Sequence, residues 1–258
     1  MKIKILIPTF NEKLSIISLL EELSKFSQHV LSKNISIDIF VIDDNSPDKT
    51  ADLVEEWVVQ HRFDNIEVLR RKNKDGLGNA YKAGIKLALA DPEITHVVSM
   101  DADGSHQVSD LHKLIGMAAD RPEAALVLGS RWMPGGGIEN WSLFRKYLSK
   151  VGTRYARWAL KLPLTDLTGG FRIYPRWSLE RIDLNQITSN GYCYQIEMAF
   201  AIKHLNKEII EVPIIFQERS MGRSKMSRGI VLEAIGKITW LGLDMRLRPN
   251  ADKLHYVK

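Results

Sequence analysis

The chain has 258 residues, of which 45% are hydrophobic and 26% are charged. This length suits one large α/β domain or two small domains, and the composition excludes a largely disordered or fibrous protein. The formal net charge is +5, and the segment 145–161 alone contains six basic residues and no acidic residue. One segment therefore holds the whole basic excess, and the rest of the chain is close to neutral.

Cys193 is the single cysteine, which excludes intramolecular disulfides and cysteine-based zinc clusters and suits a reducing compartment. The apolar start Ile3–Pro8 is too short for a signal peptide, and no apolar run reaches the ~18 residues of a membrane span. We therefore expect a cytoplasmic protein that contacts a membrane only from its surface.

The first half of the chain alternates short runs rich in β-branched residues with longer amphipathic segments. Strands are predicted at Ile3–Ile7, Ile35–Asp43, Ile66–Leu69, His96–Met100 and Ala124–Gly129. Helices are predicted at Leu14–Leu23, Thr50–Gln60, Gly78–Ala90 and Leu111–Ala119. Strands separated by helices imply right-handed crossovers and a mostly parallel sheet, and such a sheet binds ligands at the carboxyl ends of its strands.

The pattern is less regular after Ser130. It predicts a mobile loop at Pro134–Gly137, a basic helix at 145–161, a helix near Gln195–His204, a strand pair within Ile209–Phe216 and an amphipathic tail at Gly229–Leu243. No repeat, low-complexity tract or linker divides the chain. The predicted fold is a single α/β domain with a Rossmann-like, mostly parallel sheet and helices on both faces.

Two acidic motifs follow predicted strands. Asp43-Asp44 comes after the second strand, and Asp101-Ala102-Asp103 comes after the fourth. An aspartate after a strand is often a turn or capping residue, which explains one such motif well. Two motifs at the same sheet edge instead favour Mg²⁺ or Mn²⁺ held between the protein and a diphosphate, because these cations prefer oxygen ligands.

The segment Asp75–Ala80 contains Gly76 and Gly78 and partly matches a dinucleotide-binding fingerprint. Tyr81 stands where that fingerprint needs its third glycine, so the match is weak. We expect the two glycines to let the backbone approach a ligand or a neighbouring strand.

Six motifs in chain order resemble one known family. They are Pro8-Thr9-Phe10-Asn11-Glu12, Val41 to Asp48, Gly76-Leu77-Gly78, Met100-Asp101-Ala102-Asp103, Gly129-Ser130-Arg131 and Thr168-Gly169-Gly170-Phe171-Arg172. The chain resembles the family 2 glycosyltransferases of GT-A fold, and among them the dolichol- or polyprenol-phosphate mannose synthases. Ser224-Lys225-Met226 followed by Gly229-Ile230-Val231 is most similar to the polyprenol monophosphomannose synthases of actinobacteria.

The resemblance implies a GDP-mannose donor and assigns residues to it. Arg131, Arg219 and Lys225 would contact the donor, although an isolated Arg or Lys is more often a solvated surface cation. Arg219 and Lys225 flank Gly222 in an irregular loop that suits closure over phosphates. The remaining donor residues implied are Pro8, Phe10, Glu12, Ile42 and Asp44 for the guanosine, and Asp101, Ala102 and Asp103 for the sugar and the metal diphosphate.

The metal implied is Mg²⁺ or Mn²⁺ bound by Asp103. Ser105 stands where some relatives have glutamine, so a second protein ligand at Ser105 is left open. Phe10 replaces the tyrosine that is common in the family, which removes a hydroxyl and keeps the apolar face. The resemblance also implies that Arg145 and Ser149 hold the acceptor phosphate, and these two residues form the predicted catalytic group together with Asp101 and Asp103.

The basic helix has a pattern of its own. At 100° per residue, its cations Lys146, Lys150, Arg154, Arg157 and Lys161 share one arc, and Leu148, Val151, Tyr155, Trp158 and Leu162 share another. Such a helix is usually a core helix with a solvated outer face, but outer faces normally mix positive and negative charges. An anionic membrane surface is the other interpretation that the pattern favours.

These observations predict an inverting transferase that moves mannose from GDP-mannose to a polyprenyl phosphate, with 1–228 as the catalytic domain. Residues 229–258 would form an amphipathic helix and tail that pack on this domain or on the membrane surface. A polyprenyl-phosphate glucosyltransferase that uses UDP-glucose is one alternative, and a non-catalytic lipid- or RNA-binding module is another. We expect no nucleic-acid partner, because carboxylates in the cleft would repel phosphates unless a metal were bound. Anchoring by a membrane partner protein is left open.

Overall fold

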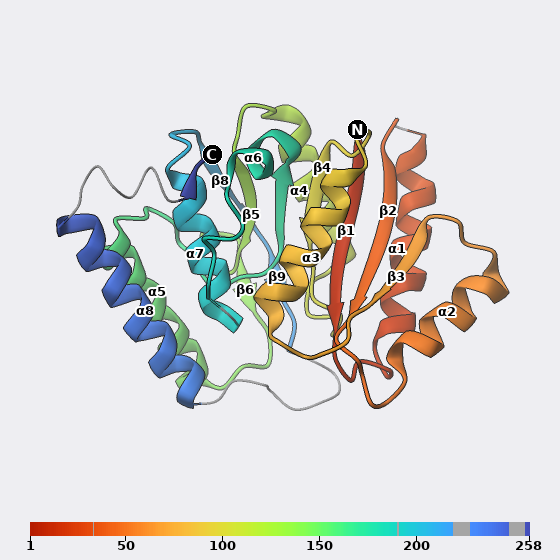
Figure 1. The fold of residues 1–258 in the computed structure, drawn as a ribbon, viewed down its shortest axis with the longest axis horizontal. Coiled ribbons are helices and arrows are strands. Elements are labelled where there is room, and N and C mark those ends of the chain that lie inside the picture. The colour runs from red at the N-terminus through yellow and green to blue at the C-terminus, as the bar shows by residue number, and fades with distance from the viewer. Residues whose placement is uncertain (33, 190, 219–227, 248–255) are drawn as a thin grey trace.

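The computed structural model describes residues 1–32, 34–189, 191–218, 228–247 and 256–258 (Figure 1). Its main sheet has the strand order β3-β2-β1-β4-β7-β5-β8. These strands are β1 (Lys2–Thr9), β2 (Ser36–Asp43), β3 (Ile66–Arg70), β4 (His96–Ser99), β5 (Leu126–Ser130), β7 (Arg172–Pro175) and β8 (Ile209–Pro213). A second, two-stranded sheet pairs β6 (Gly137–Ile138) with β9 (Ile215–Phe216).

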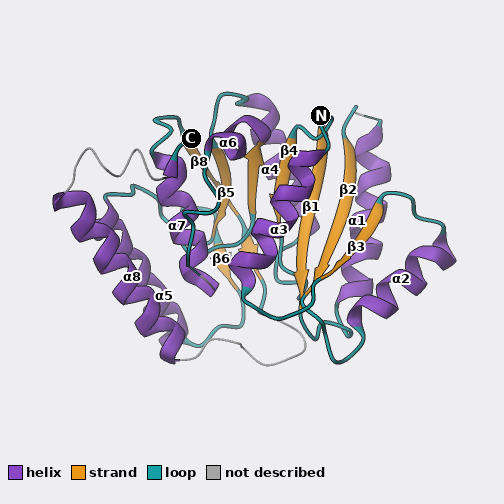
Figure 2. Ribbon diagram, viewed as in Figure 1, coloured by secondary structure: helices purple, strands orange, loops and turns teal. Residues whose placement is uncertain are grey.

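Helices cover both faces of the main sheet (Figure 2). One face packs against α1 (Ile16–Leu31), α2 (Thr50–His61) and α4 (Val108–Asp120). The other face packs against α3 (Leu77–Ala90), α6 (Arg176–Arg181) and α7 (Gly191–Lys203), with α5 (Leu143–Leu160) and α8 (Arg228–Leu247) lying side by side at one end of the molecule (Figure 1). The predicted α/β architecture with helices on both faces is confirmed.

The central strands are hydrophobic along their whole length because both of their faces are buried. In β1, Leu6 belongs to the core under α3, whereas Ile5 and Ile7 belong to the core against α1 and α4. In β2, Ile42 likewise belongs to the core under α3, and Ile39 belongs to the core against α1 and α4. The pairing of β1 with β2 sets Pro8 beside Ile42 and Thr9 beside Asp43, so the segments that follow both strands leave from the same edge.

An antiparallel strand interrupts the sheet where the sequence predicted none. Strand β7 pairs with β4 on one side and with β5 on the other, and it runs opposite to both. Its four residues are too few to show a periodicity of their own. Because β7 is reversed, its start lies at the carboxyl edge of β4, and Gly169 and Gly170 therefore reach the same edge as Asp101.

The region after Ser130 contains the predicted loop and strands, but the strands pair in an unexpected way. Two strands lie within Ile209–Phe216 and do not pair with each other, because β8 extends the main sheet beside β5 whereas β9 pairs with β6. The predicted loop at Pro134–Gly137 is a turn that leads into β6, and its mobility stays a prediction. A β-carbon on Gly136 would lie 2.5 Å from the carbonyl oxygen of Ser130, so only glycine fits there.

The glycines before and inside α3 have separate roles. Gly76 has a φ of 106°, which favours glycine, and it immediately precedes the helix. A β-carbon on Gly78 would lie 2.6 Å from the carbonyl oxygen of Ser189 and 2.9 Å from the ring of Tyr194. Gly78 thus permits close packing of α3 on α7 and its preceding loop rather than on a strand, and an approach to a ligand stays a prediction.

The basic helix, α5, buries a face that consists mostly of small side chains. Thr153, Ala156, Ala159 and Leu160 are its buried residues, whereas Val151 and Trp158 of the predicted apolar arc are 45% and 68% exposed. Helix α8 packs beside α5, where the Tyr155 hydroxyl bonds the Thr239 hydroxyl at 2.6 Å. Within the described residues, no helix is long and apolar enough to cross a membrane.

Candidate active site

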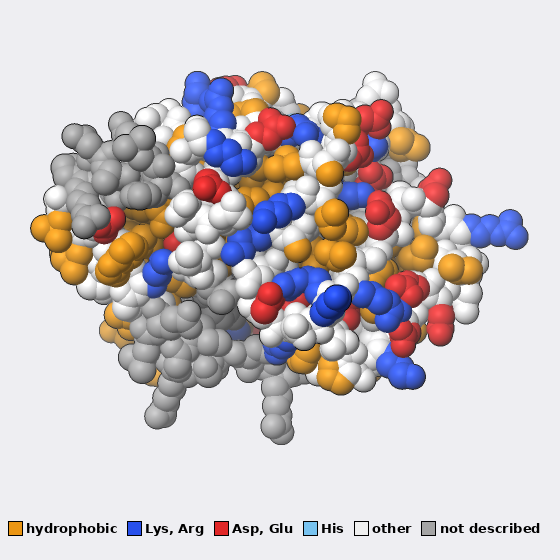
Figure 3. All heavy atoms as spheres, in the orientation of Figure 1, with side chains coloured by type: hydrophobic (Ala, Val, Ile, Leu, Met, Phe, Trp, Pro, Cys, Tyr) orange, Lys and Arg blue, Asp and Glu red, His pale blue; other side chains and the backbone are white. Residues whose placement is uncertain are grey.

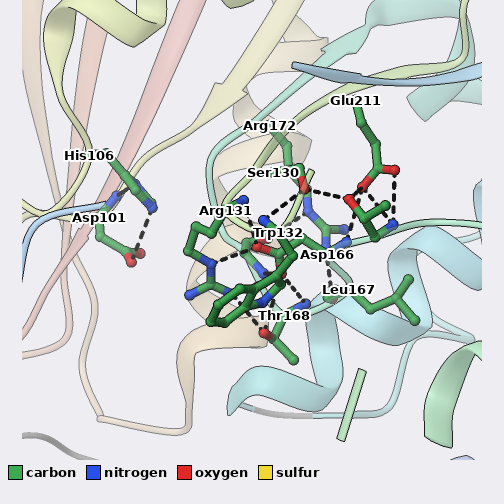
Figure 4. Close-up of polar contacts among 12 residues, drawn as sticks. Asp101, His106, Ser130, Arg131, Trp132, Asp166, Leu167, Thr168, Arg172 and Glu211 are labelled. Atoms are coloured by element: carbon green, nitrogen blue, oxygen red, sulfur yellow. Dashed lines mark hydrogen bonds and ion pairs between the residues drawn. The ribbon is translucent and has the colours of Figure 1, made fainter. Parts of the chain in front are cut away.

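The Asp101–Asp103 turn leaves the end of β4 and is stabilised by its own backbone. The Asp101 N–H donates to Nδ1 of His106 at 3.0 Å, and the Ser105 N–H donates to a carboxylate oxygen of Asp103 at 3.0 Å. Nε2 of His106 lies 3.8 Å from the Asp101 carboxylate (Figure 4). The Asp101 side chain is 33% exposed, and Asp103 is buried.

His106 is a residue that the sequence analysis missed. Its ring stacks on Phe171 with a centroid distance of 4.7 Å and meets Phe216 edge-on at 5.6 Å. Burial lowers the pKa of His106, although the negative charge of Asp101 opposes this shift. Because Nδ1 accepts a hydrogen bond, the neutral ring carries its proton on Nε2, which faces the Asp101 carboxylate. A single histidine near two aspartates gave no specific signal in the sequence.

The oxygen ligands in this turn fit a small, hard cation. Asp101 and Asp103 supply carboxylates, and the fully buried Ser105 hydroxyl has no hydrogen-bond partner in the described part of the chain. No three His, Cys, Asp or Glu side chains gather as a metal cluster among the described residues. Mg²⁺ commonly binds through one or two carboxylates and takes its other ligands from water and substrate phosphates. The oxygens of Asp101, Asp103 and Ser105 fit an ion that is bound jointly by the protein and by substrate phosphates.

A second charged group lies where β2 and β3 end. Arg71 bridges Asp44 and Asp75 through ion pairs with both carboxylates. Burial raises the pKa of Asp44, and the charge of Arg71 opposes that shift. Nearby, the ammonium of Lys74 lies 3.6 Å from the centre of the Phe10 ring. Arg71 and Lys74 were not predicted, and the only available signal was that Arg71 follows a strand at this edge.

Several predicted donor residues have defined surroundings at this edge. Pro8 is half-buried, and the Glu12 N–H donates to the Thr50 hydroxyl at 3.1 Å. Ile42 and Ala102 are buried in the core, where Ile42 packs under α3 beside Gly84. Asp43, from the same motif as Asp44, accepts from the Thr9 hydroxyl at 2.9 Å and from the Ser46 N–H at 2.9 Å. Asp43 is therefore the turn residue of the pair, and Asp44 is the one that faces a cation.

Arg131 is held in a buried ion pair just after β5. Its Nε and Nη2 donate to the two carboxylate oxygens of Asp166 at 2.6 and 2.8 Å, and Nη2 also donates to Thr168 at 2.8 Å (Figure 4). Burial by itself raises the pKa of Asp166, but Arg131 and backbone hydrogen bonds hold that pKa below its ordinary value. The charge of Arg131 is thus matched by Asp166, and donor contact by Arg131 stays a prediction.

The predicted acceptor residues lie at the start of α5. Nη1 of Arg145 donates to the Glu218 carboxylate at 2.8 Å, and the guanidinium lies 3.9 Å from the centre of the Trp141 ring. Ser149 is half-buried and follows Arg145 by four positions, which places it on the same side of the helix. The other predicted cations, Arg219 and Lys225, lie outside the described residues.

Comparisons with known proteins show the family to which the chain belongs. Residues 4–183 match the model of the glycosyl transferase family 2. The chain is 43% identical to an undecaprenyl-phosphate mannosyltransferase of Micrococcus luteus, over 95% of this chain and 96% of that protein. It is 39% identical to a polyprenol monophosphomannose synthase of Mycolicibacterium smegmatis, over 94% of this chain and 88% of that protein.

Solved structures share the fold at low sequence identity. Mannosyl-3-phosphoglycerate synthase from Rubrobacter xylanophilus superposes with a TM-score of 0.64 at 16% identity, covering 97% of this chain and 75% of that chain. A mannosyltransferase from Pyrobaculum calidifontis in complex with GDP-Man and Mn²⁺ gives 0.61 at 18% identity, covering 95% and 64%. The architecture is the GT-A fold of these enzymes, and by the match across most of its length the chain belongs to glycosyl transferase family 2.

Proposed function

We propose that this chain transfers mannose from GDP-mannose to a polyprenyl phosphate with inversion, which gives β-mannosyl phosphopolyprenol and GDP. The main support is the 43% identity, over nearly the whole of both chains, with an undecaprenyl-phosphate mannosyltransferase. The edge that carries Asp101 and Asp103 suits a sugar diphosphate, and Arg145 at the start of the basic helix α5 suits an acceptor phosphate. The activity is that of a dolichyl- or polyprenyl-phosphate β-D-mannosyltransferase.

Such a reaction needs no general base. A phosphate monoester is already an anion near neutral pH because its second pKa is about 6, whereas an alcohol acceptor would have to be deprotonated. The surroundings of His106 agree with this, since the ring is buried and turned toward Asp101. The chemical task of the chain is to orient the acceptor anion opposite the leaving GDP and to balance the charge of both phosphate groups.

Different residues of the site would bind the acceptor and the donor. Arg145 and Ser149 would hold the acceptor phosphate, which would take the place of the Glu218 carboxylate on Arg145. Pro8, Phe10, Glu12, Ile42 and Asp44 would hold the guanosine, and Arg131, Arg219 and Lys225 would contact the donor. Mg²⁺ or Mn²⁺, held by Asp103 and Ser105, would supply positive charge for the leaving diphosphate.

The lipid acceptor also implies a location. We propose that the chain acts as a peripheral protein at the cytoplasmic face of a membrane, with α5 toward the anionic surface. This keeps the acceptor phosphate near Arg145 while the lipid tail stays in the bilayer. A membrane partner protein is the alternative anchor, and direct lipid binding separates the two.

A donor screen tests the proposal. The purified chain is incubated with a short polyprenyl phosphate and with GDP-mannose, UDP-glucose or UDP-N-acetylglucosamine in turn, and the lipid product is identified by mass spectrometry and its anomer by NMR. The expected result is β-mannosyl transfer from GDP-mannose alone. Transfer from UDP-glucose would replace the proposal with the glucosyltransferase, and lipid or RNA binding without transfer from any donor would favour a non-catalytic module.

A further inference from the structure

The side-chain amide of Gln195 is buried, and no described residue pairs with it. Gln195 lies in the first half of α7 and is only 2% exposed. Neither its amide nitrogen nor its amide oxygen makes a hydrogen bond within the described part of the chain. Buried polar groups are nearly always paired, because an unpaired one has lost its bonds to water. The amide of Gln195 therefore has a hydrogen-bonding capacity that the described residues do not use.

The amide lies beside the acidic turn of the site. A β-carbon built on Gly170 would be 3.5 Å from Nε2 of Gln195, 3.4 Å from a carboxylate oxygen of Asp101 and 3.7 Å from Cε1 of His106. The missing side chain of Gly170 thus leaves a methyl-sized gap that the amide and the carboxylate both border. Gly170 is not among the glycines with a positive φ, so its backbone does not require glycine.

The surrounding structure fixes the position of Gln195. Arg172 is fully buried, and its guanidinium donates to the carbonyl oxygens of Gly169, Gln195 and Leu167 at 2.8, 2.7 and 3.0 Å. These three bonds tie α7 to the start of β7. The backbone of Gln195 is therefore held by the protein, while its amide is left for another molecule.

We propose that the Gln195 amide binds a hydroxyl group of the transferred hexose, which would sit between this amide and Asp101. The inference rests on the proposed function, because it places the sugar of the donor at this turn. A hexose hydroxyl both donates and accepts hydrogen bonds, and so does an amide.

Two variants test the inference. Gln195→Met keeps the length of the side chain and removes its hydrogen bonds, and Gly170→Ala fills the gap at distances that are ordinary van der Waals contacts. Affinities for GDP-mannose and for GDP are measured by calorimetry with Mg²⁺ present. We expect both variants to lose about tenfold in GDP-mannose affinity and to keep the affinity for GDP. Gln186→Met, at an exposed glutamine, is the matched control and should change neither.

Thermal unfolding separates a binding role from a structural one. Because no described residue hydrogen-bonds the amide, Gln195→Met should leave the melting temperature unchanged or raise it. A lower melting temperature with an unchanged affinity for GDP-mannose would show that Gln195 has a structural role. If neither the melting temperature nor the GDP-mannose affinity changes, the amide binds only water, and the inference is overturned. Equal losses for GDP and GDP-mannose would also overturn the inference. If the unmodified chain binds no GDP-mannose, the proposed function fails instead, and the same comparison is made with UDP-glucose and UDP.

Discussion

Asp103 is the residue on which the proposed metal site most depends. Its carboxylate is buried and is oriented by the Ser105 N–H. We expect Asp103→Asn to keep the fold and to lower turnover by a factor on the order of 10² or more, because an amide removes the charge that a divalent cation needs. Steady-state rates and Mn²⁺ binding are measured together. Full activity of this variant in a chelator-treated assay would end the metal hypothesis.

A substitution at Arg145 tests acceptor binding independently of donor binding. If it holds the lipid phosphate, Arg145→Ala should weaken acceptor use by about 1.5 to 3 kcal/mol, the range for a hydrogen bond to a charged group. Donor affinity should hardly change. Kinetics with each substrate varied in turn measure the two effects, and equal losses for donor and acceptor would indicate a structural role. Glu218→Gln is the companion variant, because it removes the carboxylate that Arg145 now binds.

His96 gives a test of pH-dependent stability away from the site. Burial, together with the nearby N-terminal ammonium, lowers the pKa of His96 to about 4 from an ordinary value of 6.5. Between these two values the unfolded chain binds a proton that the folded chain does not, so stability falls as the pH falls through this window. The slope contributed is at most about 1.4 kcal/mol per pH unit. Urea unfolding from pH 7 to 4 should show a shallower decline for His96→Gln than for the unmodified chain.

At the scale of elements, the Arg131–Asp166 pair joins the end of β5 to the loop that precedes β7. Both side chains are almost fully buried, at 4% and 0% exposure. Asp166→Asn leaves the Arg131 charge without its partner, so it should lower the free energy of unfolding by about 3 to 5 kcal/mol.

Glu180→Gln is the matched control for this pair. It breaks the Arg176–Glu180 ion pair, whose carboxylate is 50% exposed, and it should cost less than about 1 kcal/mol. Urea denaturation compares the two variants. If Asp166→Asn is as mild as the control, Arg131 is held by its other contacts, and a direct role in donor binding becomes the better explanation of its position.

At the scale of the whole molecule, α5 and α8 expose apolar side chains beside basic ones. Phe144, Tyr147 and Trp158 of α5 are 75%, 68% and 68% exposed, and Trp240 and Leu243 of α8 are 56% and 51% exposed. Hydrophobic side chains gather at this end of the molecule in Figure 3. Lys150, Arg154 and Arg157 of α5 are exposed as well. Aromatic and basic residues together are typical of surfaces that lie in a membrane interface.

Binding to liposomes tests this surface. Each basic residue near an anionic leaflet contributes about 1 kcal/mol, and the field is screened over about 8 Å at physiological salt. We expect binding that needs anionic lipid, weakens with salt and is lost when Lys150, Arg154 and Arg157 are changed to Glu. Changing the exposed Lys25, Arg62 and Lys86, on or next to α1, α2 and α3, is the control. If liposome binding does not depend on lipid charge, on salt or on the three α5 substitutions, a partner protein is the better explanation of how the chain is anchored.

The sequence by itself determined the first five strands, the helices between them and the edge at which the acidic motifs lie. Those features follow from local patterns, because a strand buried on both faces is continuously apolar and a helix repeats its apolar residues every three or four positions. The order of the motifs was enough to identify the family. The positions of Asp44, Asp101 and Asp103 just after strands β2 and β4 were predicted for the same reason.

The tertiary structure decided what depends on contacts between distant segments. The strand β7 is too short to be seen in the pattern, and it is stable because β4 and β5 supply hydrogen bonds on both sides. Arg131 meets Asp166 across 35 residues of sequence, and the core side of α5 is its face of small residues, on which other helices can pack closely. The amide of Gln195 beside Asp101, which no described residue pairs, is visible only in three dimensions, because hydrogen-bond satisfaction is a property of the folded surroundings and not of residue type.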